Sequence, residues 1–141
     1  MFEFLTPHQA ILIVVIPLLA SPICLIVRHS GIAWLIALVA SWISFAIAIN
    51  LLNQVTTVGP ISYLLGNWPA PWGIEYKVDT LSAFVLLFIS GISSITLIFA
   101  RKSVCFEIAE DRIYLFYTMF LLAFAGLLGI TITGDAFNLF V

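Results

Sequence analysis

Four long apolar segments constrain this chain more than any other feature of its sequence. They cover residues 10–27, 32–52, 80–100 and 113–133, and none of them contains Asp, Glu, Lys or Arg. A bilayer core about 30 Å thick needs about 20 helical residues to cross it, and backbone polar groups in lipid have to be hydrogen-bonded within the segment. The segments therefore predict four transmembrane helices. Barrel strands would alternate apolar and polar residues, whereas these segments are apolar throughout.

The composition supports an all-α membrane protein. Charged residues make up 9% of the 141-residue chain, whereas a soluble domain carries about 25%, so most of the surface has to face lipid. The net charge of −2 offers no basic surface for nucleic acid. The first segment is preceded by Glu3 and His8 and by no Lys or Arg, which favours a retained membrane helix over a signal peptide.

The basic residues predict an orientation. The loops 28–31 and 101–112 contain Arg28, Arg101, Lys102 and Arg112, whereas the connection between the second and third segments contains only Lys77. Because Lys and Arg accumulate in cytoplasmic loops, we expect these two loops in the cytoplasm. The N-terminus, the 53–79 connection and the C-terminal end then lie outside, in a multi-pass protein of the cell (plasma) membrane.

No catalytic, cofactor-binding or metal-binding pattern is present in the sequence. Cys24 and Cys105 are isolated, with no partner at metal-ligand spacing and nothing to favour a disulfide between them. Charges inside a membrane span usually mark a functional site, and the four segments contain none. We therefore expect no proton or sodium path formed by this chain alone, and an enzymatic role only within a redox-driven complex.

Two carboxylates at predicted helix starts are the candidate ion-pathway residues. Asp79 precedes Thr80-Leu-Ser82, where a carboxylate caps free backbone N–H groups. Asp135 follows Gly134, which is expected to end the fourth helix, and it begins a new apolar run that predicts the start of a fifth helix. Capping and a place on an ion entry route are both open for each residue.

Three short stretches carry a family resemblance. They are Gly66-Asn-Trp-Pro-Ala-Pro-Trp-Gly-Ile74, Asp79-Thr-Leu-Ser82 and Gly134-Asp-Ala-Phe-Asn-Leu-Phe-Val141. With the four-helix layout, they resemble the antiporter-like membrane subunits related to respiratory complex I, and most of all the D-type subunits of Mrp multisubunit cation/proton antiporters. Asn67 is a departure, because a second Gly is common there.

The resemblance implies that residues 1–141 are a single transmembrane region, the N-terminal portion of a larger subunit. Members of the family have a functional Glu on the fifth helix, and a Lys and a His on later, broken helices. This sequence has none of those positions. The implied function is that of flanking helices in a proton-coupled Na⁺/H⁺ antiporter subunit. Its partners would be other membrane subunits, the lipid bilayer, monovalent cations and protons.

Two alternatives stay open at the level of sequence. One is a proton-pumping antiporter-like subunit of a complex I-related or membrane-bound hydrogenase assembly. The other is a four-helix scaffold subunit that transports nothing, which the absence of charge within the spans would suit.

Overall fold

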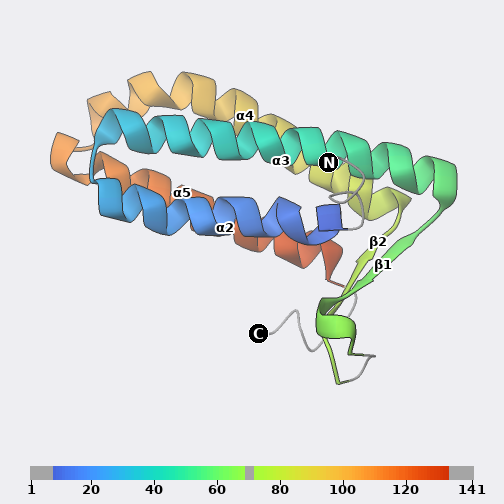
Figure 1. Ribbon diagram of the computed structural model, residues 1–141. Helices are drawn as coiled ribbons and strands as arrows, with labels where there is room; N and C mark the ends of the chain where they lie inside the picture. Colours follow the sequence, from blue (N-terminus) through green and yellow to red (C-terminus); the bar gives the residue numbers. More distant parts are fainter. Residues whose placement is uncertain (1–7, 69–71, 134–141) are drawn as a thin grey trace.

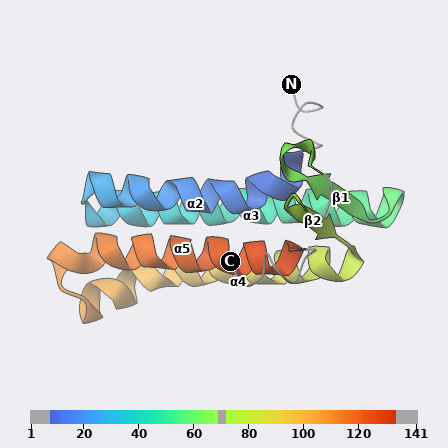
Figure 2. The same ribbon diagram turned by 90° about the horizontal axis from the view of Figure 1, so that it is seen from below.

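Four long helices, each antiparallel to the next along the chain, form a bundle in the computed structural model, which describes residues 8–68 and 72–133 (Figure 1). They are α2 (Gln9–Val27), α3 (Ser30–Val58), α4 (Thr80–Glu107) and α5 (Ile113–Ile132). All four are long and apolar enough to cross a membrane. Figure 2 shows α2 and α3 as one layer and α4 and α5 as a second. The prediction of an all-α membrane protein with four transmembrane helices is thus confirmed.

The antiparallel arrangement gives the bundle two chemically different ends. Arg28, Arg101, Lys102 and Arg112 belong to one, which we call the basic end. The other, the hairpin end, contains the start of α2, the end of α3, the start of α4 and the end of α5. A short β-hairpin leaves the bundle there (Figure 1).

Two helices are longer than the hydropathy predicted. The second segment was expected to end at Leu52, but α3 continues to Val58, and the third was expected to end at Ala100, but α4 continues to Glu107. Helices need not end where the hydrocarbon core ends, because their backbone hydrogen bonds are internal. The predicted loops 28–31 and 101–112 are correspondingly shorter. Arg28 and His29 alone separate α2 from α3, and residues 108–109 and the turn η3 (Glu110–Arg112) separate α4 from α5.

The 53–79 connection contains a hairpin that the sequence analysis did not predict. Strand β1 (Ile61–Leu64) pairs antiparallel with β2 (Glu75–Val78), so that Ile61 lies opposite Val78 and Leu64 opposite Glu75. The turn η2 (Leu65–Asn67) follows β1. The burial of Val78, which is 0% exposed, attaches the hairpin to the core.

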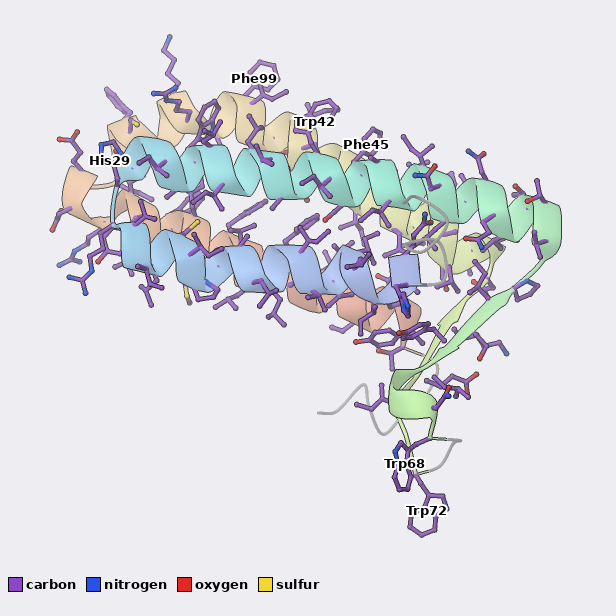
Figure 3. All side chains as sticks on the ribbon, viewed as in Figure 1. His29, Trp42, Phe45, Trp68, Trp72 and Phe99 are labelled. Atoms are coloured by element: carbon purple, nitrogen blue, oxygen red, sulfur yellow. The ribbon has the colours of Figure 1, made fainter. Side chains whose placement is uncertain are left out.

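Glycines shape the far end of the hairpin. Gly66 has a φ of 71°, which glycine adopts without strain. A Cβ atom at Gly73 would collide with the backbone carbonyl of Trp68. Trp68 and Trp72 are exposed and lie well away from the helices (Figure 3). The two glycines are therefore required by the tight backbone of this projecting segment.

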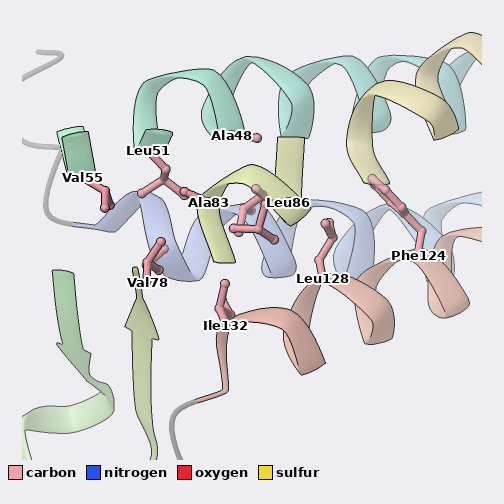
Figure 4. Packing of buried hydrophobic residues seen from close by; sticks show 11 residues of the cluster. Ala48, Leu51, Val55, Val78, Ala83, Leu86, Phe124, Leu128 and Ile132 are labelled. Atoms are coloured by element: carbon pink, nitrogen blue, oxygen red, sulfur yellow. The ribbon is translucent and has the colours of Figure 1, made fainter. Parts of the chain in front are cut away.

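Two clusters of buried residues hold the bundle together. The cluster nearer the hairpin end contains Leu51, Leu86, Phe124, Leu128 and Ile132 together with Val78 of the hairpin (Figure 4). The cluster nearer the basic end is rich in small residues: Ala20, Cys24, Ala33, Ala37 and Ala40. Small residues allow helix backbones to approach closely, which is how helices associate in lipid.

Buried hydroxyl groups add hydrogen bonds between the helices. Pro17 has no N–H group, so the carbonyl of Ile13 loses its usual helical donor. The hydroxyl of Ser44 on α3 donates to that carbonyl, at 3.5 Å. The hydroxyl of Ser21 on α2 donates to the carbonyl of Thr118 on α5, at 3.0 Å. Of the two prolines within α2, Pro17 and Pro22, the first is therefore compensated by a neighbouring helix, as membrane interiors require.

Candidate functional site

Asp79 is the N-cap of α4. Its backbone is extended, and its Oδ1 atom accepts a hydrogen bond from the backbone N–H of Ser82 at 2.7 Å. That hydrogen bond lowers the pKa of the Asp79 carboxyl below its ordinary value, and the charge of Lys77 acts in the same direction. The predicted capping role is therefore present in the structure. The carboxylate is exposed to solvent, so it also places a fixed negative charge in water at the hairpin end.

A second carboxylate lies close by along β2. The side chain of Glu75 accepts a hydrogen bond from the hydroxyl of Ser62 on β1. Lys77 is exposed on the same strand, two residues before Asp79. The start of α4 and the hairpin thus carry two carboxylates and one ammonium group, all within reach of water.

The hairpin is fastened to the helices by polar contacts that span much of the sequence. The Nδ1 atom of His8, just before α2, lies 2.8 Å from the hydroxyl of Tyr63 on β1, and their rings meet edge to face. Tyr76 on β2 forms an isolated bridge with Thr133, which follows α5. Burial raises the pKa of the Tyr76 hydroxyl. Among the described residues, the Oε1 atom of Gln9 is buried without a hydrogen-bond partner.

The sequence analysis missed this hairpin-end cluster of His8, Gln9, Tyr63 and Tyr76. The residues of Ile61-Ser-Tyr-Leu64 and Glu75-Tyr-Lys-Val78 mix apolar and polar side chains over four positions each, and Gly and Pro lie between them. That pattern is the signal for a hairpin with a long loop. It would have indicated the strands, although not the contact with His8.

The other candidate, Asp135, lies outside the described residues, as do Gly134 and the predicted start of a fifth helix. The described chain ends at Thr133, whose bridge to Tyr76 places that residue beside β2. Asp79 follows Tyr76 by only three positions. The structure therefore places Thr133, two residues before Asp135, beside the strand that leads to Asp79, and it does not place Asp135 itself.

Hydroxyl groups are the main polar side chains in the interior of the bundle. Ser90 and Ser94 each donate to a carbonyl one turn earlier in α4. Tyr117 is 1% exposed, and its hydroxyl has no hydrogen-bond partner among the described residues. Cys24 is buried and Cys105 exposed, and both are free thiols. Within residues 8–68 and 72–133, His, Cys, Asp and Glu form no group of three that could hold a metal ion.

Comparison with known proteins finds relatives in two groups. The chain is 35% identical over 145 residues to the N subunit of NADH-quinone oxidoreductase from Desulforudis audaxviator, an alignment that covers 97% of this chain and 28% of that protein. It is 31% identical over 135 residues to the D subunit of the Na⁺/H⁺ antiporter of Alkalihalophilus pseudofirmus, covering 95% and 27%. It is 42% identical over 79 residues to the D subunit of a probable K⁺/H⁺ antiporter of Rhizobium meliloti, covering 56% and 14%.

No protein-family model matches the chain. The chain spans about a quarter of the length of the first two of these relatives. The similarity covers nearly all of the chain, so it includes the four helices and the hairpin together.

Proposed function

Because this chain is homologous over most of its length to antiporter-like membrane subunits, we propose that it is the N-terminal part of a proton-coupled monovalent cation antiporter subunit in a multisubunit membrane complex. The observation that carries the proposal is the similarity to the D subunits of antiporters across all four helices. The partners would be other membrane subunits, and the transported ions would be protons and Na⁺ or K⁺.

In this proposal, residues 1–141 supply flanking helices and not the ion relay. Helices α2, α3 and α5 contain no Asp, Glu, Lys or Arg, and the charges of α4 are confined to residues 101–107. A relay through a membrane needs protonatable groups at depth, in water-lined or broken helices. The buried serines donate to backbone carbonyls, which suits packing. The relay groups would lie in the remainder of the subunit.

The proposed orientation has the basic end in the cytoplasm. Arg28, Arg101, Lys102 and Arg112 belong to the basic end, and Lys77 alone to the hairpin end. The excess of positive residues on one side favours that side as the cytoplasmic one, in the plasma membrane. The hairpin, Asp79 and the region around Asp135 would then meet ions from the outside.

A redox-driven pump is the second candidate, and the relative from Desulforudis audaxviator favours it, since its name is that of a quinone oxidoreductase component. Such a protein would move protons in response to electron transfer, without exchanging them for Na⁺ or K⁺. The four-helix architecture suits both candidates.

Ion exchange in membrane vesicles tests the proposal. The complete complex would be expressed in a host that lacks its own antiporters, and a pH gradient would be established across everted vesicles. Addition of Na⁺ or K⁺ should dissipate the gradient, and vesicles lacking this chain should keep it. A different result would contradict the antiporter proposal and support the redox-driven one. In that result neither Na⁺ nor K⁺ changes the pH gradient, and an electron donor generates the gradient only in vesicles that contain this chain.

A further inference from the structure

An open apolar groove runs between α2 and α3. Its volume is about 430 Å³, within the range of about 300–1,000 Å³ of small-molecule sites. Its walls include Leu19 and Ile23 of α2, and Leu35, Val39 and Ile43 of α3, each between 41% and 59% exposed. These two helices form one layer of the bundle, with α4 and α5 in the other (Figure 2). A hollow between two membrane-spanning helices would be filled by a flexible apolar chain.

The groove extends along the helix axis over about the thickness of one leaflet of a bilayer. It extends along α2 from Ile23 to Ile16, which at 1.5 Å per residue is about 7.5–18 Å from Arg28. Half of a hydrocarbon core is about 15 Å thick. A lipid whose headgroup lies level with Arg28 would therefore place its acyl chain along the groove, and the end of that chain would lie near the middle of the membrane.

A positive charge sits at the end of the groove where a headgroup would lie. Arg28 and His29 form the connection between the two helices that make the groove, and Arg28 is exposed and has no ion pair among the described residues. The three acidic residues of the basic end, Glu107, Glu110 and Asp111, belong to α4 and η3 and not to this connection. An anionic headgroup would therefore meet Arg28 first.

The backbone of Arg28 adds an independent observation. It is the C-cap of α2 and has a φ of 51°, in the left-handed region. Helix ends with this conformation usually have Gly or Asn there, because a Cβ atom is disfavoured. An arginine at such a position costs backbone energy that glycine would avoid, and it places a guanidinium group at the end of α2.

We infer that the α2–α3 groove binds an anionic phospholipid, with one acyl chain along the groove and the phosphate at Arg28. The inference rests on the shape, depth and charge of this part of the chain and is independent of the antiporter proposal. The site would hold one specifically bound lipid near the basic end of the bundle.

The test compares two lipids with identical acyl chains. The intact protein would be purified in detergent and titrated with phosphatidylglycerol or phosphatidylcholine, with bound lipid followed by native mass spectrometry and stability by thermal unfolding. We expect half-saturation at about a five-fold lower concentration of phosphatidylglycerol, the gain that one basic residue gives near an anionic headgroup. Inorganic phosphate, which lacks acyl chains, should give no stabilisation.

Variants test the headgroup contact and the acyl-chain groove separately. Arg28→Gln should remove the preference for phosphatidylglycerol, whereas Lys102→Gln, a charge of the same end on another helix, should keep it. Arg28→Gly should be at least as stable as the native protein without lipid, because glycine suits the left-handed backbone, yet gain less from phosphatidylglycerol. Val39→Phe, at an exposed position in the lining of the groove, should weaken binding of both lipids, and Ile49→Phe, at an exposed position of α3 outside the groove, should not.

Three results would overturn the inference. The first is an unchanged lipid preference in Arg28→Gln. The second is an equal loss of preference in Lys102→Gln, which would indicate a general attraction to the basic end. The third is loss of a co-purifying subunit from Val39→Phe with no change in bound lipid, which would assign the groove to a protein partner.

Discussion

The guanidinium group of Arg101 lies over the indole ring of Trp34, 4.7 Å from the ring centroid. The same indole donates its N–H to the carbonyl of Leu97 at 2.8 Å. Trp34 is on α3, and both partners are on α4, so one side chain joins the two helices near the basic end. A cation over an aromatic face is attracted by the negative π-electron density. Together the two contacts fix how α4 lies against α3.

Replacement of Trp34 by Phe should destabilise this junction. A phenyl ring at that position keeps an aromatic face for Arg101 but has no N–H donor, so we expect a loss of about 1–2 kcal/mol in the free energy of unfolding. Unfolding of the purified protein with a denaturing detergent would measure it. Trp42→Phe is the matched control, because Trp42 is 45% exposed on the same helix. An equal effect of the two substitutions would show that the indole N–H contributes nothing.

Replacement of Tyr117 by Phe should leave the free energy of unfolding unchanged or raise it, unlike the replacement of Trp34. Its hydroxyl is buried without a partner among the described residues, and a desolvated hydroxyl without a hydrogen bond is unfavourable. We expect the variant to be as stable as the native protein or more stable by up to about 1 kcal/mol. The same unfolding assay applies, with Tyr114→Phe as the control. A clear loss of stability would mean that an internal water or another subunit satisfies the hydroxyl.

The sequence was enough to predict the four helices but not where they end. Uncharged segments of this length have few other structures available in lipid, so the helices between Ala10 and Thr133 could be predicted without any tertiary information. Beyond Leu52, helix α3 continues through residues with no hydropathy signal. There the hydroxyls of Thr56 and Thr57 donate back to carbonyls of Leu52 and Asn53, which are contacts within the helix that hydropathy does not report.

In the candidate site, contacts between residues close in the sequence could be predicted, and contacts between distant residues could not. The cap at Asp79 could be predicted because donor and acceptor are three residues apart. The contact between His8 and Tyr63 joins residues 55 positions apart, so no local pattern contains it. It depends on how the hairpin folds over the start of α2, which is a tertiary property.

Asp79 should support stability in a way that depends on pH. The hydrogen bond from Ser82 lowers the pKa of the carboxyl below its ordinary value in the folded protein. A lowered pKa stabilises the fold above the ordinary value, and the stabilisation is lost as the pH falls through the folded-state pKa. Because the carboxylate is exposed, the effect is small. Thermal unfolding between about pH 7 and pH 3 should show a steeper decline in the native protein than in Asp79→Asn.

Substitution of Asp79 also separates capping from charge. Asn caps helices about as well as Asp, whereas Ala costs about 1 kcal/mol. We therefore expect Asp79→Asn to resemble the native protein at neutral pH, and Asp79→Ala to be less stable and to leave less of the protein assembled in the membrane, as judged by immunoblot. Equal assembly of the Ala and native proteins would show that the cap is not needed to hold the hairpin and α4 in place.

Transport should depend on Asp135 more than on Asp79. Asp79 is already committed to Ser82 and can be replaced by an amide that makes the same hydrogen bond, so Asp79→Asn should change cation-dependent dissipation of a pH gradient by less than about two-fold. Asp135 begins the apolar run that the family resemblance connects to the conducting repeat, so Asp135→Asn should lower the rate several-fold. Everted vesicles with matched amounts of assembled complex would measure both rates. Native activity in both variants would remove Asp79 and Asp135 from the ion pathway. A larger loss in Asp79→Asn would move the entry point to the start of α4, because only the charge of that carboxylate distinguishes it from the amide.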